Sequence, residues 1–139
     1  MGMRETIEYC VDSAIKIGSQ TYDKSLDFSE ESVKIVGGIL DGYHERYLHP
    51  EEDEGLIREH ANTYAHIFGI YVGEVLLRRM DSGCGWAETE YGIVLAKDDR
   101  NVINPIAKAY KHIVHGKENG DDVNSFFQIA MMIMEGKLK

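Results

Sequence analysis

Apolar residues recur every three or four positions along most of this chain, which is the spacing of one buried face of an α-helix. Residues 4–18 follow the pattern first, and a polar run then interrupts it. The broadest apolar face lies in the middle of the chain, from about Glu54 to Met80, and predicts a long central helix that is buried on several sides. In all, the pattern predicts five helices, at about 4–18, 30–47, 54–80, 105–115 and 123–134.

Residues that cap helices support three of these starts. Ser29 precedes two glutamates, and its hydroxyl can accept the first free N–H groups of the next helix, while Phe28 can pack over Val33. Asn104 followed by Pro105 is a typical helix start. The final helix is expected to be capped by one of two neighbouring aspartates, 121 or 122.

Between residues 81 and 104 the apolar spacing changes from helical to alternating. Trp86 opens the alternating run WAETEY, and the apolar run GIVLAK follows it, before a polar turn and Val102-Ile103. This pattern predicts two to three antiparallel strands. The predicted fold is therefore one α+β domain over residues 1–139, with about five helices and the long central helix packed on a small antiparallel sheet.

The stretch GIYVGEVLLRR on the long helix raises the question of why two glycines and a glutamate interrupt an apolar surface. Gly69 and Gly73 lie on the same side of the helix, so another backbone can approach closely there. Glu74 is four residues before Arg78, the favourable order for an ion pair. We expect the two side chains to form an internal polar tie that reaches the Trp86 Nε1–H or the backbone of a strand; a ligand-binding carboxylate and a general base are the alternatives.

The charge of the chain is −9 and is unevenly distributed. Residues 26–60 contain ten acidic and three basic residues. A nucleic-acid site needs basic patches, so this distribution argues against nucleic acid and favours a basic protein partner. The expected contacts with that partner are Glu51, Glu52, Asp53 and Glu54; a solvated face that aids solubility is the other interpretation.

The composition, 43% hydrophobic and 28% charged, is that of a soluble globular protein. No apolar run approaches a membrane span and the first residues are acidic, so we expect a cytoplasmic protein that does not bind membranes. The two cysteines do not form a disulfide framework, although Cys84 would be a reactive thiol if exposed. The six histidines show no metal-binding motif, and no metal or cofactor is expected.

Part of the chain resembles a family of small bacterial proteins of unknown function. The resemblance covers roughly residues 26–135 and leaves out the helical extension 1–25. It is carried by a helix with the pattern GxYxGE and a basic pair, a glycine–tryptophan strand and a helix that begins with proline. The matching residues are Gly69, Tyr71, Gly73, Glu74, Arg78, Arg79, Gly85, Trp86 and Pro105. Some relatives belong to toxin-immunity systems, so the resemblance implies a binding role.

Three functional hypotheses follow. The first is a non-enzymatic, immunity-like binding protein whose acidic segment faces a basic partner. The second is a small-molecule-binding protein or hydrolase, with a pocket formed by Tyr71, Glu74, Arg78, Trp86 and His60. The third is a structural homodimer in which the methionine-rich last helix pairs with its copy; the oligomeric state, monomer or homodimer, stays open.

Overall fold

The computed structural model describes residues 2–80 and 83–134, and its architecture confirms the predicted α+β class. In the described residues six α-helices and two short 3₁₀ turns accompany a three-stranded antiparallel sheet. The helices are α1 (Met3–Tyr22), α2 (Glu30–Leu48), α3 (Leu56–Glu59), α4 (Ala61–Arg79), α5 (Pro105–His115) and α6 (Val123–Met134). The strands are β1 (Gly85–Thr89), β2 (Gly92–Ala96) and β3 (Val102–Ile103), and the 3₁₀ turns are η1 (Pro50–Glu52) and η2 (Lys117–Asn119).

The predicted helix caps are present. The Ser29 hydroxyl accepts the N–H of Ser32 at 3.1 Å, and Asn104 Oδ1 accepts the N–H of Ala107 at 3.0 Å. Each bond satisfies a backbone donor that the first turn of a helix leaves without an intrahelical partner. These two residues therefore set where α2 and α5 begin.

The prediction of one continuous helix from Glu54 to Met80 is wrong at its N-terminal end. Glu54 and Gly55 adopt left-handed backbone angles, with φ of 58° and 76°, and the helical path breaks again at His60, so that α4 begins at Ala61. Asp53 holds the turn, because its two carboxylate oxygens accept the N–H groups of Gly55 and Ile57, each at 3.1 Å.

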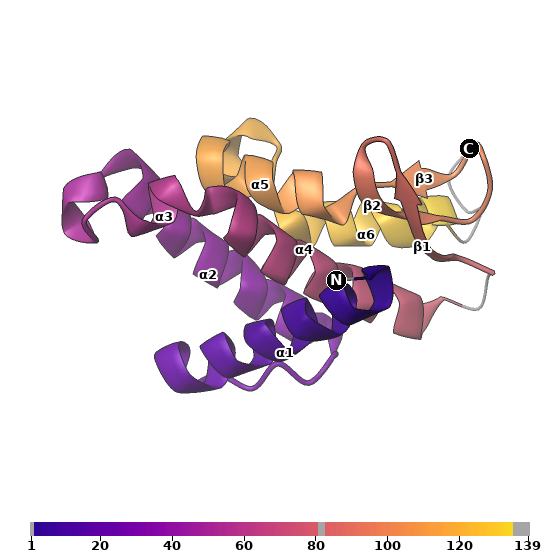
Figure 1. Cartoon of the computed structure of the whole chain (residues 1–139), viewed down its shortest axis with the longest axis horizontal. Coiled ribbons are helices and arrows are strands. Elements are labelled where there is room, and N and C mark those ends of the chain that lie inside the picture. The colour runs from indigo at the N-terminus through magenta and orange to yellow at the C-terminus, as the bar shows by residue number, and fades with distance from the viewer. Residues whose placement is uncertain (1, 81–82, 135–139) are drawn as a thin grey trace.

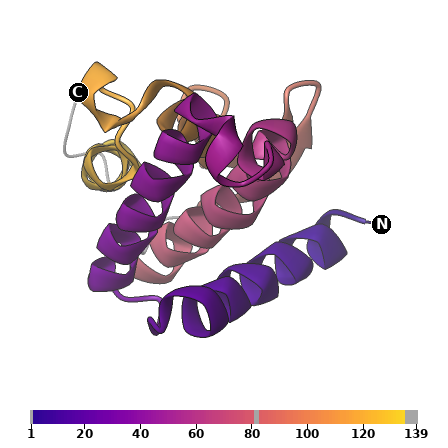
Figure 2. The same cartoon turned by 90° about the vertical axis from the view of Figure 1, so that its left-hand side faces the viewer.

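Helix α4 contacts each of the other five α-helices. Figure 1 shows α1 on one side of α4 and α5 on the other, and Figure 2 shows the same layers from the end formed by η1 and α3. Although α1 lies outside the family resemblance, its buried residues Ile7, Cys10 and Ala14 belong to the same hydrophobic cluster as α4. None of the described helices combines the length and the apolar character needed to cross a lipid bilayer.

The sheet has the order β1-β2-β3 and is attached to the helices by one of its faces. Trp86 pairs with Leu95 in the antiparallel register, and Leu95 pairs with Ile103, so the three side chains lie on the same face. β2 packs against α5, whereas Trp86 of β1 reaches α4. At β1, the predicted packing of the sheet on the central helix is made by Trp86, which lies on Gly73 of α4.

The two glycines of α4 explain how the sheet and α5 come so close. A methyl group at Gly69 would lie 2.6 Å from Ile106 Cα and 2.8 Å from the Pro105 carbonyl oxygen. A methyl group at Gly73 would lie 2.3 Å from the Trp86 ring. The predicted close backbone approach at Gly69 is confirmed, and at Gly73 the neighbour is an indole ring.

We expect Gly69→Ala to lower the free energy of unfolding by about 1–3 kcal/mol, because the backbone of α5 must move to make room. The matched control is Gly38→Ala on α2, where a methyl group would meet no atom within 4 Å. That control should raise stability by up to about 1 kcal/mol through helix propensity alone. Urea unfolding of both variants measures the difference; a stabilised Gly69→Ala would contradict the close approach.

Candidate functional site

Glu74 and Trp86 form the polar contact that joins α4 to the sheet. The indole Nε1–H of Trp86 donates to Glu74 Oε2 at 3.0 Å, and both residues are half-buried. A half-buried carboxylate needs such a partner, since desolvation without one is costly. The predicted tie from Glu74 to Trp86 is confirmed, and it leaves Glu74 with a structural role.

The predicted ion pair between Glu74 and Arg78 is wrong. The Arg78 guanidinium instead lies over the ring of Phe28, 3.5 Å from its centroid. Phe28 stacks in turn on Tyr71, with the ring centroids 5.2 Å apart. Helical spacing places Glu74 and Arg78 on one side of α4. The ring of Phe28, in the loop before α2, nevertheless lies against the Arg78 guanidinium, and such a cation–π contact contributes about 0.5–2 kcal/mol.

Tyr71 is buried and its hydroxyl is fully engaged. It accepts the N–H of Phe28 at 2.9 Å and donates to the Ser32 hydroxyl at 2.8 Å. Phe28 has a φ of 65°, a left-handed conformation that bulky residues rarely adopt. The bond to Tyr71 and the stacked rings hold the residue there, so the Tyr71 hydroxyl joins the start of α2 to α4 and is not available to a ligand.

Of the five residues predicted to form a small-molecule pocket, Tyr71, Glu74, Arg78 and Trp86 lie near one another, and His60 lies apart from them. His60 is exposed at the start of α4, 14 residues and therefore roughly 21 Å along the helix axis from Glu74. It lines a cavity of about 330 Å³ with residues of α1 and α4, among them Tyr9 and Tyr64. Tyr71, Glu74, Arg78 and Trp86 line neither this cavity nor four other well-formed cavities among the described residues.

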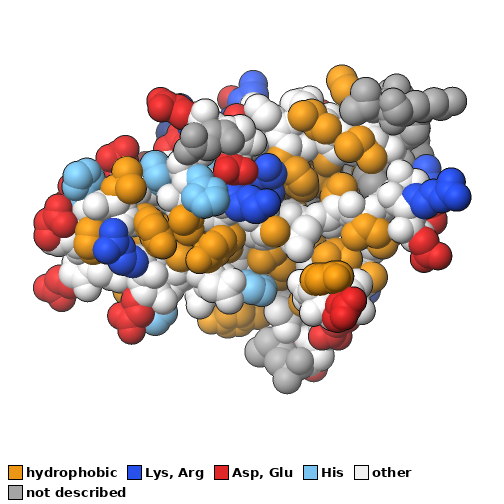
Figure 3. All heavy atoms as spheres, turned by 90° about the horizontal axis from the view of Figure 1, so that it is seen from above, with side chains coloured by type: hydrophobic (Ala, Val, Ile, Leu, Met, Phe, Trp, Pro, Cys, Tyr) orange, Lys and Arg blue, Asp and Glu red, His pale blue; other side chains and the backbone are white. Residues whose placement is uncertain are grey.

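The four predicted partner contacts lie at the end of the molecule formed by η1 and α3. Glu51, Glu52 and Glu54 are exposed, and Glu45 and Glu59 are exposed beside them at this end. Asp53 differs, because it is half-buried and both of its oxygens accept backbone N–H groups. We call the five exposed glutamates, together with Leu48 and Leu56, the acidic end; Figure 3 shows carboxylates gathered around it.

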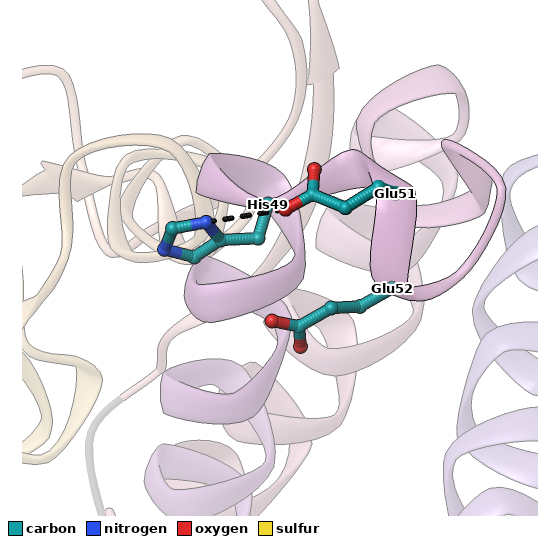
Figure 4. A group of neighbouring side chains, drawn as sticks. All are labelled: His49, Glu51 and Glu52. Atoms are coloured by element: carbon teal, nitrogen blue, oxygen red, sulfur yellow. Dashed lines mark ion pairs between the residues drawn. The ribbon is translucent and has the colours of Figure 1, made fainter.

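His49, Glu51 and Glu52 form a cluster within the acidic end. One ligand atom of each lies within 4.8 Å of the others, and His49 Nδ1 is 3.4 Å from Glu51 Oε1. Figure 4 shows the imidazole and the Glu51 carboxylate facing one another, with Glu52 extending toward them from the same turn. The sequence pattern did not indicate this grouping. All three side chains are exposed, so water competes fully for any cation there.

A second group of polar residues, between α2 and α5, was also missed. His112 is completely buried, and its Nε2 is 2.7 Å from Asp41 Oδ1. The N–H of Val123 donates to His112 Nδ1 at 3.2 Å, so Nδ1 carries no proton and Nε2–H donates to Asp41. No pattern in the sequence indicated that His112 is buried or that its partner lies on α2.

Asp41 also lines a cavity of about 620 Å³. The cavity lies between the C-terminal half of α2 and the end of α5 with η2; its lining residues are Asp41, Gly42, His44, Glu45, Leu48, His115, Gly116, Lys117 and Glu118. Glu45 and Leu48 also belong to the acidic end, so the cavity adjoins it. A volume of this size is within the range of small-ligand sites.

Comparisons of the chain with protein-family models, with curated proteins and with solved structures find no match. The resemblance to small bacterial proteins of unknown function therefore stays a prediction.

We expect Glu74→Gln to leave the free energy of unfolding nearly unchanged, because the amide oxygen still accepts the Trp86 N–H. Glu74→Leu should lower it by about 1 kcal/mol, since the indole N–H then loses its acceptor. Urea unfolding followed by fluorescence of Trp86, the one tryptophan of the chain, measures both. An equal loss in the two variants would show that the negative charge itself is required.

Burial raises the pKa of the Cys84 thiol, although Lys97 and the Gly85 N–H partly oppose it. A raised pKa lowers the thiolate fraction at neutral pH, so the native protein should react slowly with a disulfide reagent at pH 7. The rate is measured for Cys10→Ser, which isolates Cys84, before and after unfolding in guanidinium. Equal rates in the two states would show that Cys84 is a reactive surface thiol.

Proposed function

We propose that this protein is a non-enzymatic binding protein whose acidic end docks a basic protein partner. The observation that carries the proposal is that two exposed leucines lie among carboxylates that, apart from Glu51 beside His49, form no ion pair with the described residues. Leu48 is 50% exposed and Leu56 is 47% exposed. Protein interfaces commonly combine such apolar anchors with a polar rim, and both components are present here.

The carboxylates of the acidic end are largely uncompensated. Within the described part of the chain, Glu45, Glu52, Glu54 and Glu59 form no ion pair, and Glu51 pairs only with His49. Unpaired carboxylates that stay in contact with water lower the stability of the fold little. Together they attract a partner of opposite charge within about a Debye length of the surface.

Arg58, on α3, has a structural role. Arg58 donates to the Tyr47 carbonyl oxygen through Nε at 3.0 Å and through one terminal nitrogen at 2.6 Å, and it lies over the Tyr47 ring. This contact clamps α3 to the end of α2, beside Leu48. The leucines and glutamates are thus held on a fixed support, as a docking surface requires.

The immunity-like role implied by the family resemblance is one form of this proposal, in which the basic partner would be a toxin. Charge complementarity carries the broader proposal on its own. It requires a cationic partner that also offers apolar side chains to Leu48 and Leu56.

The test uses a fluorescein-labelled peptide of alternating lysine and leucine, with binding followed by anisotropy. We expect the triple variant Glu51→Gln, Glu52→Gln, Glu54→Gln to weaken binding about tenfold, because each exposed ion pair contributes about 0.5 kcal/mol and 1.4 kcal/mol is a factor of ten. Raising the salt concentration should slow association with the wild type.

The matched control removes the same charge from α1, by Glu5→Gln, Glu8→Gln and Asp12→Asn, where the three side chains are exposed. Its affinity should stay within about twofold of the wild type, since only the general attraction of net charge changes. Equal weakening in the two triple variants would contradict a docking surface at the acidic end.

A further inference from the structure

We propose that the cavity between α2 and α5 receives a lysine or arginine side chain of the partner, with Asp41 as its counter-ion. This inference rests on the proposed function, because it assigns one binding pocket to the basic partner that the acidic end attracts. The cavity shares Glu45 and Leu48 with the acidic end.

The Asp41 carboxylate is held in a fixed orientation. A completely buried histidine, His112, donates to one oxygen of Asp41 and accepts the N–H of Val123 with its other ring nitrogen. The imidazole is thereby locked between α2 and the start of α6, and it fixes the orientation of the carboxylate. The second oxygen of Asp41 makes no contact with His112, and the Asp41 side chain is 38% exposed.

A cation of the protein itself, the Lys117 ammonium, already lies near the second oxygen of Asp41, Oδ2. Lys117 Nζ lies 3.6 Å from Asp41 Oδ2, at the mouth of the same cavity. The lysine side chain is 58% exposed and comes from the short η2 turn, so holding it in place contributes little free energy. Lys117 therefore marks a cation position that a stronger or bidentate donor from a partner can take over.

The charge and shape of the cavity lining suit a long cationic side chain. The cavity carries three carboxylates, of Asp41, Glu45 and Glu118, against one lysine, and it lies at the C-terminal end of α5, the negative end of the helix dipole. Gly42 contributes no side chain to the wall on α2. The lining therefore favours a cation and leaves room for the stem of a long side chain.

His44 completes the wall of the cavity. Its Nδ1 lies 2.8 Å from the Ile113 carbonyl oxygen, so Nδ1–H donates to that oxygen. The ring packs on Gly116, where a methyl group would lie 2.7 Å from His44 Nε2. The wall is thus held by one hydrogen bond and one close contact, and it stays in place when Lys117 moves.

The deciding experiment measures the lysine–leucine peptide with Asp41→Asn and with Lys117→Met. Asp41→Asn should weaken binding about five- to tenfold, since a charged partner loses its counter-ion while His112 Nε2–H still donates to the amide oxygen. Lys117→Met should tighten binding about two- to fivefold, because the competing internal cation is gone. The opposite signs distinguish this pocket from a general effect of the acidic end.

Each variant has a control with the same change of charge. Glu8→Gln removes an exposed carboxylate from α1, and Lys111→Met removes an exposed lysine from α5 outside the cavity. Both should change the affinity less than about twofold. In addition, the NMR signal of the His112 Nε2–H in the wild type should shift as the peptide binds, because its acceptor Asp41 gains a new partner.

Three results would overturn the proposal. If Asp41→Asn and Lys117→Met match their controls while the triple glutamate variant still weakens binding, the acidic end docks the peptide without this pocket. If the peptide does not bind the wild type, or binds it without regard to the glutamates, the pocket and the proposed function both fail. If N-acetyl-lysine methylamide alone shifts the His112 signal at the peptide's concentration, the pocket belongs to a free small cation.

Discussion

The close approach of α5 and Trp86 to α4 is the constraint on which the rest of the structure depends. Gly69 admits the backbone of α5, and Gly73 admits the indole ring, whose N–H is then held by Glu74. These contacts hold both the N-terminal end of α5 and the sheet against α4. Because α5 is a single helix of 11 residues, its far end is placed beside α2, where His112 meets Asp41 and the cavity lies.

Features that depend on neighbours in sequence were predictable, because their physical cause is local. The caps at Ser29 and Asn104, the strands that follow Trp86 and the glycine pair of α4 are examples. The break before α4 was missed for a related reason. The apolar spacing continues through it, and the turn depends on Asp53 accepting two backbone N–H groups, which the spacing of apolar residues does not report.

The candidate site was only partly predictable, because tertiary packing decides which side chains meet. Helical spacing correctly put Glu74 and Arg78 on one side, yet Arg78 stacks on Phe28 from a loop 50 residues earlier, and Glu74 takes the indole N–H. The contact between Asp41 and His112 joins residues 71 positions apart and has no signature in either helix. The acidic segment was visible from charge alone, but its exposed leucines and the adjoining cavity required the fold.

The turn at Asp53 has a consequence for the kinetics of recognition. Its carboxylate and the clamp made by Arg58 hold the segment from Tyr47 to Glu59 in one conformation, with Glu54 and Gly55 committed to left-handed angles. A surface that is already ordered loses little conformational entropy when it is covered. Under the proposed function, a partner would dock without a slow rearrangement of this segment, and the fixed spacing of the glutamates would favour partners with cations at matching intervals.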